Sequence, residues 1–436
     1  MRISRTMKLV LMIVVVCAGV AMARRADASG AEVLLTDLYV SLNGIEGNAG
    51  SIDDPLPSLD AARLRLRQVP GDHTVTVWIQ GGVYDVGQAI EFTNDDRDNV
   101  IYRALPGQSP VLDAGLPIAG FGETTIDGVT VWAALVPPLL LQGGDDQVLA
   151  LYDDEGALPL NRYPKTGYLE ADRFELNDAA SALRYGSEGE LSNVNSFRAF
   201  FAGKDLTGSG VNPAAFADPQ NVLVRILHLW KDETAYLRGY DPQTGRIALS
   251  RATSLTIWPG DQYYFENMRE GLSLPGSWYL DRNAGVLLVV PKPGWDISAL
   301  TLRAGVSDRI MTLSGLDNVT FKDVTFTHTG WSVPDEADFP QAAYDVEAAV
   351  FALNCSYLSF EGCVFRDLGG TALKLYQGVS DSKVAGCLFE RVGANGVFVH
   401  GVNMRRDPRR DERIEITDNE IHDYGVNYHN AVGVLL

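Results

Sequence analysis

The C-terminal third of the chain carries short segments in which apolar and polar residues alternate. Four of these segments align with one another, and each is followed by a turn that contains glycine: residues 319–326, 358–365, 383–389 and 414–421. Alternation with a period of two predicts β-strands that bury one face. The aligned inward positions form three columns: Phe321, Phe360, Val384 and Ile416; Val324, Cys363, Cys387 and Asn419; Phe326, Phe365, Phe389 and Ile421. Such columns predict stacks of like side chains inside a repeat protein.

The spacing of the segments predicts the length of one repeat. Cys363 and Cys387 are 24 residues apart, which suffices for one coil of three short strands and their turns. The wider intervals, 39 and 32 residues, equal one coil plus polar insertions at 331–341 and 402–412. Because stacked coils bury a continuous core, the pattern predicts an all-β fold, a parallel β-helix (solenoid). A β-sandwich is the alternative, but it does not predict three aligned columns.

The region from 116 to 304 lacks this pattern and contains aromatic-rich strands instead. We therefore expect an inserted β-rich domain at 116–304, between an N-terminal cap with the first coil at 33–115 and further coils at 305–436. The chain stops at residue 436 within an apolar strand, while the column pattern is still running. The expectation is a β-helix that is truncated at its C-terminus and that is a monomer at full length.

The N-terminus predicts export. Three basic residues precede an apolar run at 9–22, and small residues follow up to Ala28. This arrangement is typical of a secretory signal peptide, here 1–28, cleaved after Ala23 or Ala28. The expected location is periplasmic or extracellular. No later apolar stretch is long enough for a membrane span.

Charge and cysteine content narrow the picture further. The chain has 36 basic and 56 acidic residues; without residues 1–28, which hold five basic and one acidic residue, 31 and 55 remain, a net charge of −24. Such a surface repels nucleic acid and anionic membranes, and neutral glycan is an easier ligand than polyanionic glycan. Three cysteines remain after export. Cys363 and Cys387 are expected to be free thiols, because neighbouring coils hold β-carbons about 4.8 Å apart, farther than the roughly 3.8 Å of a disulfide.

Several segments resemble known right-handed β-helix proteins. Residues 38–44 and Leu59-Asp-Ala-Ala-Arg63 resemble the first segment of pectate-lyase-like proteins, and 74–84 resembles their first coil. Asn161-Arg-Tyr-Pro164, residues 276–285 and Phe326-Thr-His-Thr-Gly-Trp331 are similar to exported β-helix proteins that include glycoside hydrolase family 141. The resemblance implies a right-handed helix and a polysaccharide or oligosaccharide as partner.

A lateral column follows the last inward position of each coil. Its members are His328, Asp367, Arg391 and Asp423, which we expect to project outward along one ridge. Asp367 and Asp423 lie two coils, or about 9.6 Å, apart, so their carboxylates suit inverting glycoside hydrolysis. Glu390 gives an alternative, closer partner for Asp367. A purely structural ladder around Arg391 is the other reading of the same residues.

Three function classes follow from this column. A glycoside hydrolase needs the paired carboxylates; a polysaccharide lyase that cleaves uronate-containing glycan needs a base such as Arg391 beside acids that bind calcium. The third class is a glycan-binding or surface protein without catalysis. Expected substrate-binding residues are His328, Trp331, Arg391 and His400. No metal site is predicted, because His400, His422 and His429 match no zinc spacing, and no cofactor is expected unless the lyase needs calcium.

Overall fold

The computed structural model describes residues 35–141, 150–175, 198–201, 213, 216–228, 230–241, 246–251, 253, 255, 257, 260–333, 341–401 and 409–436. The predicted signal peptide, residues 1–28, lies outside this described part. Residues 36–436 form one compact unit. The chain is mostly β-structure, with parallel and antiparallel sheets. No helix within the described ranges is long and apolar enough to cross a membrane.

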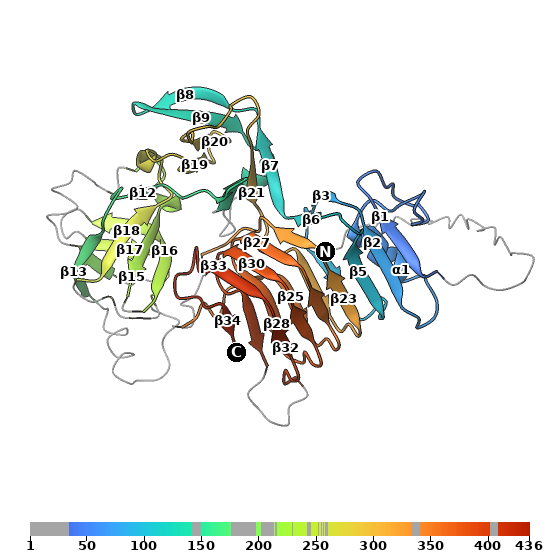
Figure 1. Ribbon diagram of the computed structural model, residues 1–436. Coiled ribbons are helices and arrows are strands. Elements are labelled where there is room, and N and C mark those ends of the chain that lie inside the picture. Colours follow the sequence, from blue (N-terminus) through green and yellow to red (C-terminus); the bar gives the residue numbers. More distant parts are fainter. Residues whose placement is uncertain are drawn as a thin grey trace, which may run out of the picture. The chain divides into compact units, whose positions relative to one another are not determined.

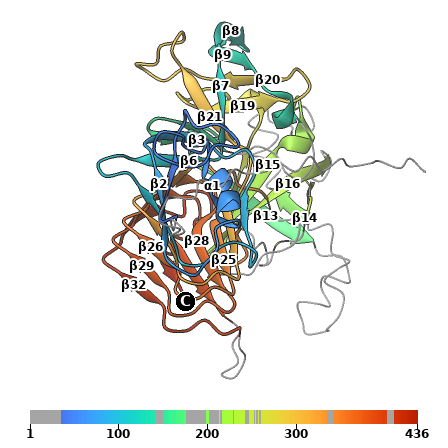
Figure 2. The same cartoon turned by 90° about the vertical axis from the view of Figure 1, so that its right-hand side faces the viewer.

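Three parallel sheets receive successive strands of the chain in turn. The first sheet contains β1 (Asp37–Val40), β2 (Val75–Ile79), β5 (Val100–Ala104), β23 (Val319–Lys322), β26 (Ser359–Glu361), β29 (Lys383–Ala385) and β32 (Glu415–Thr417). The second contains β3 (Gly82–Asp85), β6 (Pro110–Asp113), β24 (Thr325–Thr327), β27 (Val364–Leu368), β30 (Leu388–Val392) and β33 (Glu420–Tyr424). The third contains β4 (Ile90–Phe92), β22 (Met311–Ser314), β25 (Ala348–Leu353), β28 (Thr371–Tyr376), β31 (Val397–His400) and β34 (Val434–Leu435). Successive strands of each sheet lie side by side (Figures 1 and 2).

The register of these sheets confirms two of the predicted columns. Phe321 pairs with Phe360, which pairs with Val384, and the second sheet aligns Phe326, Phe365 and Phe389 in the same way. The rings of Phe365 and Phe389 are stacked with centroids 4.7 Å apart. The spacing of parallel strands therefore brings like rings into contact, which stabilises each strand pair by about 0.5 to 1.5 kcal/mol beyond burial.

The third column holds buried thiols. Cys363 and Cys387 are free and buried. Cys355, which precedes β26 where Cys363 follows it, is also free and buried. Leu388 donates its backbone N–H to the carbonyl of Cys363 at 2.9 Å, so the two cysteines occupy equivalent places in neighbouring coils. The column ends at Asn419, whose side-chain oxygen accepts the backbone N–H of Cys387 at 2.8 Å.

The first coil carries the main helix, α1 (Leu59–Leu66). Ser58 caps its N-terminus by accepting the backbone N–H of Ala61. Arg63 on this helix is buried and binds Asp96 at 2.9 Å. Of the two stretches that resemble the first segment of pectate-lyase-like proteins, Leu59–Arg63 is thus helical, whereas the other begins in β1.

Between β6 and β22 the chain builds three antiparallel sheets. Their strands are β7 (Gly115–Ala119), β8 (Gly122–Ile126), β9 (Val129–Leu135), β10 (Ala150–Asp153), β11 (Gly156–Ala157), β12 (Arg162–Tyr163), β13 (Leu169–Glu175), β14 (Arg198–Phe201), β15 (Leu223–Leu227), β16 (Asp232–Asp241), β17 (Arg246–Leu249), β18 (Gln262–Glu266), β19 (Trp278–Asp281), β20 (Val286–Val289) and β21 (Thr301–Gly305). Short 3₁₀ turns lie at Pro138–Leu141, Pro219–Asn221 and Arg269–Gly271. We call residues 115–305 the antiparallel segment.

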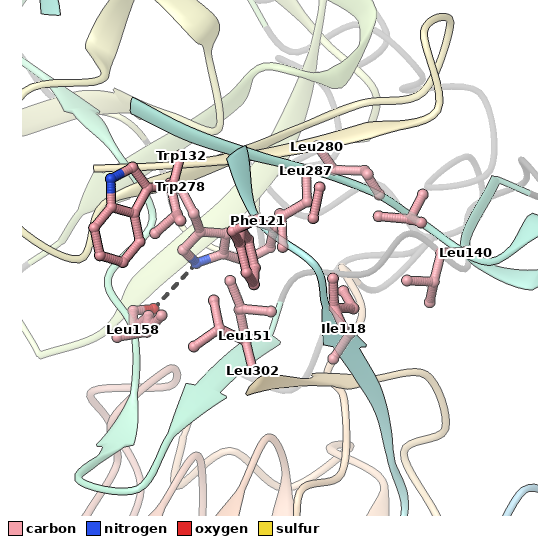
Figure 3. Packing of buried hydrophobic residues seen from close by; sticks show 14 residues of the cluster. Ile118, Phe121, Trp132, Leu140, Leu151, Leu158, Trp278, Leu280, Leu287 and Leu302 are labelled. Carbon is pink, nitrogen blue, oxygen red and sulfur yellow. Dashed lines mark hydrogen bonds between the residues drawn. The ribbon is translucent and has the colours of Figure 1, made fainter. Parts of the chain in front are cut away.

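The antiparallel segment has apolar cores of its own. In one of them Trp278 is fully buried, and its indole N–H donates to the carbonyl of Leu158 at 3.2 Å (Figure 3). β7 and β21, the first and last strands of the segment, pair with each other. The segment therefore begins and ends at paired strands, between β6 of the second parallel sheet and β22 of the third.

Candidate functional site

The predicted lateral column exists and has one backbone conformation. His328, Asp367, Arg391 and Asp423 have φ of 61°, 54°, 51° and 52°. Positive φ is uncommon outside glycine and is tolerated best by Asn, Asp and His, so each coil bends at the same point. The bend lies where the second parallel sheet gives way to the third. We call these four residues the ridge.

Asp367 is the buried centre of the ridge. Its two carboxylate oxygens accept hydrogen bonds from Arg391, Oδ1 from Nε at 2.7 Å and Oδ2 from Nη2 at 3.0 Å. Hydrogen bonding to Asp367 raises the pKa of Arg391 above its ordinary value. Asp367 lies on the outward ridge, as expected, but it is only 5% exposed, because the antiparallel segment covers it. The start of β11 covers it, since a Cβ on Gly156 would lie 3.0 Å from Asp367 Oδ1.

Glu390 and Asp367 accept hydrogen bonds from the same guanidinium, that of Arg391. Nη2 of Arg391 donates to Asp367 Oδ2 at 3.0 Å and to Glu390 Oε1 at 3.2 Å. These two oxygens can be no farther apart than the sum of the two distances. That limit lies below the roughly 6.5 Å at which inverting carboxylate pairs begin. The alternative pair, Asp367 with Glu390, is therefore the closer of the two that the sequence suggested.

Asp423 differs from Asp367 in exposure. Its side chain is 69% exposed and accepts a hydrogen bond from His422 Nδ1 at 2.9 Å. This hydrogen bond raises the pKa of His422 above its ordinary value. The strand of Arg391 lies between the strands of Asp367 and Asp423, as the sequence predicted.

The other end of the ridge contains a residue that sequence reasoning missed. His328 Nδ1 lies 3.0 Å from Oδ1 of Asp113, which is buried at the end of β6. Asp113 is aligned with Thr327, one position before the ridge. The signal was present in Pro110-Val-Leu-Asp113, where Leu112 continues the column of Phe326. The antiparallel segment separates this strand from the later repeats, so the repeat pattern of the C-terminal third does not include it.

A cleft of about 300 Å³ adjoins the ridge at Arg391. One wall comes from the parallel sheets and their loops and includes Trp331, Leu368 and Asn427; the other comes from the antiparallel segment. Tyr152, Arg162, Arg225, Tyr264 and Glu266 contribute to that second wall. The predicted substrate-binding residues Arg391 and Trp331 thus line one cleft, with aromatic rings and charged groups opposite. Pockets that bind small ligands combine an apolar wall with a few placed polar groups in this way.

A buried ionic network holds the two walls together. Arg225 donates to Asp232 at 2.6 Å, to Glu266 at 2.9 Å and to the backbone carbonyl of Asn427 at 2.8 Å. His429 Nδ1 lies 3.0 Å from Asp232. Burial alone would raise the pKa of Asp232, but hydrogen bonds from His429 and Arg225 outweigh it and lower the pKa.

His400 lies away from the ridge, on β31 of the third sheet. Its ring contacts Tyr376 and Phe398, and its Nε2 lies 2.7 Å from the hydroxyl of Tyr344. Burial, and then the charge of Lys374, lowers the pKa of His400. His400, His422 and His429 each have different partners. In the described ranges, no three His, Cys, Asp or Glu side chains are grouped to hold a metal ion.

Comparison with known proteins finds likeness in structure alone. No family model matches the chain, and no curated protein sequence does. A solved structure described as "Glycoside hydrolase" is similar over 92% of this chain and 75% of that chain, with a TM-score of 0.71 and 17% identity. "The complex structure of XylC with xylose" (92% and 56%, TM-score 0.43, 12% identity) and "Rhamnogalacturonan lyase" (92% and 60%, TM-score 0.34, 8% identity) are more distant. The chain spans between half and two thirds of the length of these two. The similarity to the first structure shows a shared fold.

Proposed function

We propose that this chain is an exported glycoside hydrolase that acts on polysaccharide through carboxylates of the ridge. Its scaffold is a right-handed parallel β-helix that carries an inserted domain at 116–304. The observation that carries the proposal is the convergence of Asp367 and Glu390 on Arg391, which lines the cleft. The fold shared with a glycoside hydrolase supports the proposal by analogy.

Glycoside hydrolysis requires one carboxylic acid to protonate the leaving oxygen and one carboxylate on the other side of the sugar. Asp367 is the central member, since it is buried and held in one orientation by Arg391. With Glu390 as its partner, the pair would act by a retaining mechanism, in which the carboxyl groups are roughly 5 to 5.5 Å apart and one carboxylate forms a covalent glycosyl intermediate. With Asp423 as its partner, two strands away, the separation corresponds to an inverting mechanism with water between them.

The aromatic and charged groups of the cleft supply the binding surface. Trp331, Tyr152 and Tyr264 line the cleft with the small part of each ring that is not buried. Ring surface of this kind packs against the apolar faces of sugars. Arg162 stacks on Tyr264 with its guanidinium carbon 3.9 Å from the ring centroid, and so holds its N–H groups in a fixed plane. Polar groups held in this way can donate to sugar hydroxyls without losing much side-chain entropy.

The lyase alternative uses Arg391 as base, and the geometry disfavours that role. A base must be deprotonated before it removes a proton, whereas the hydrogen bond to Asp367 raises the pKa of Arg391. The same contacts suit a group that orients two carboxylates. The third function class is a glycan-binding protein without catalysis, and the test below also distinguishes it from a hydrolase.

The test combines two cleavage assays, a binding measurement and ¹H NMR of the product with three variants. Reducing-sugar release from xylan, arabinan, β-glucan and pectin is measured beside the absorbance of unsaturated uronate ends. We expect hydrolysis without unsaturated products and loss of about 10²-fold or more of kcat in Asp367→Asn. The anomer formed first, read by ¹H NMR, selects the partner. Retention with an inactive Glu390→Gln variant supports Glu390, and inversion with an inactive Asp423→Asn variant supports Asp423. Unsaturated products, or binding without any cleavage, would overturn the hydrolase proposal.

A further inference from the structure

At the His328 end of the ridge lies a carboxylate–imidazole pair. Asp113 Oδ1 lies 3.0 Å from His328 Nδ1, although 215 positions separate the two residues. The Asp113 side chain is 3% exposed and that of His328 is 18% exposed. A buried carboxylate beside an imidazole favours the tautomer with its proton on Nδ1, because the carboxylate can only accept. Nε2 is then the acceptor, and it is the ring nitrogen that can meet a ligand.

Asp113 itself is held on two further sides. Its Oδ1 accepts the backbone N–H of Gly115 at 2.7 Å, and Oδ2 lies 3.5 Å from Arg303 Nε. Gly115 leaves no room for a side chain, since a Cβ there would lie 2.8 Å from the Cβ of His328. Asp113 and His328 are thus enclosed where the antiparallel segment leaves the parallel sheets. The carboxylate has little freedom to turn away from the imidazole.

The pair adjoins the buried carboxylate of the proposed active site. The backbone N–H of His328 donates to the carbonyl of Asp367 at 2.9 Å, and the two residues are neighbours on the ridge. The ring of Tyr152, which lines the cleft, lies 5.0 Å from the His328 ring. Asp367 and His328 lie beside the lining of the cleft, and a sugar that reached Asp367 from the cleft would have His328 one strand away, on the side opposite Arg391.

We propose that His328 binds a hydroxyl group of the sugar held at Asp367, with Nε2 as acceptor, and that Asp113 is the positioning residue that keeps the proton on Nδ1. This inference rests on the proposed glycoside hydrolase function and adds to it a requirement on the substrate. The sugar must present a free hydroxyl towards the Asp113 end of the ridge. Hydrogen bonds of this kind strengthen as the transition state forms, so their loss affects kcat as well as KM.

Asp85 provides a matched control for Asp113. It occupies the equivalent position on the neighbouring strand β3 and binds Arg303 Nη1 at 2.8 Å. Its side chain is 65% exposed. Asp85→Asn therefore changes the same partner, Arg303, without removing the carboxylate that faces His328. Effects that arise from Arg303 alone appear in both variants.

The first measurement is the tautomer of His328, which needs no activity. In ¹⁵N-labelled protein, the imidazole nitrogen shifts, assigned by comparison with His328→Asn, should show a proton on Nδ1 in the wild type and in Asp85→Asn. Asp113→Asn should shift the ring towards the Nε2-protonated form. A proton on Nε2 in the wild type would overturn the positioning role of Asp113, whatever the enzyme does.

The second measurement uses the oligosaccharide that the wild type hydrolyses fastest among xylotetraose, cellotetraose and tetragalacturonic acid. Saturation with it in the Asp367→Asn variant should move the Nε2 resonance of His328. Asp113→Asn should lower kcat/KM by roughly ten- to a hundredfold, with Asp85→Asn within about twofold of wild type. Hydrolysis with an unmoved Nε2 resonance would overturn this inference and leave the proposed function standing. Absence of hydrolysis and binding for all three would instead defeat the proposed function, and the sugar-binding role with it.

Discussion

Arg391 donates two hydrogen bonds to the carboxylate of Asp367, from Nε at 2.7 Å and from Nη2 at 3.0 Å. The pair links neighbouring strands of the second parallel sheet, β27 and β30. The carboxylate side chain is 7% exposed, whereas the arginine side chain is 32% exposed and reaches the cleft. A bidentate pair restricts both groups more than a single contact does, so the orientation of Asp367 is set before any ligand arrives.

Because Asp367 is buried and Asp423 is exposed, substitution of these two predicted catalytic aspartates should change the stability of the protein by different amounts. Asp367→Asn removes the charge that Arg391 pairs with and should destabilise the protein by about 2 kcal/mol, less than a fully buried pair because Arg391 is partly exposed. Asp423→Asn changes an exposed side chain and should leave the melting temperature within about 1 °C of wild type. Differential scanning calorimetry of the two variants measures the contrast. Equal melting temperatures would mean that the Asp367 pair is solvated.

The first residue of β11, Gly156, should tolerate no side chain. This glycine has φ of 127°, and a Cβ would lie 3.0 Å from atoms of both Arg391 and Asp367. Gly156→Ala should cost about 2 to 3 kcal/mol, from backbone strain together with displacement of the ion pair. Gly167→Ala is the control, because φ there is 73° and a Cβ meets nothing within 4 Å. It should cost about 1 kcal/mol. Urea titrations compare them, and equal midpoints would contradict the close contact.

Acid should weaken the ionic network that joins the cleft walls. Hydrogen bonds from His429 and Arg225 lower the pKa of Asp232 despite its burial. A group with a depressed folded pKa stabilises the protein above its unfolded value, about 3.9, and this stabilisation is lost as pH falls towards the folded value. Unfolding free energy measured from pH 6 to pH 2.5 should therefore decline less in Asp232→Asn than in wild type. Glu155→Gln, which removes an exposed ion pair with Lys292, should keep the wild-type decline. Parallel curves for wild type and Asp232→Asn would contradict the network's role.

The buried thiols should resist reagents until the protein unfolds. Burial raises the pKa of Cys363, which reduces its reactive thiolate fraction as well as its access to solvent. We expect no iodoacetamide uptake at Cys355, Cys363 or Cys387 in native protein at pH 8, and full uptake at all three in guanidinium. Peptide mass spectrometry reads each site separately. Unlabelled Cys363 and Cys387 after denaturation without reductant would indicate a disulfide.

Local patterns in the sequence determined the repeat and its inward columns. Alternation and the 24-residue interval report on single strands and single coils, so Phe321, Phe326 and their aligned residues could be predicted from neighbouring positions alone. The ridge followed from the same alignment. Its left-handed backbone did not, although Asp and His at this position are compatible with it.

The chemistry of the ridge was decided by contacts between distant parts of the chain. Asp113 reaches His328 across 215 positions, and Arg225 reaches Asn427 across 202. Asp367 is buried because Gly156 of β11, far away in the sequence, covers it, which no feature of its own strand encodes. A periodic pattern records which face of a strand avoids water. It does not record which segment covers the opposite face, because that depends on how the long insertions pack against the parallel sheets. This packing decides which carboxylates are buried and oriented.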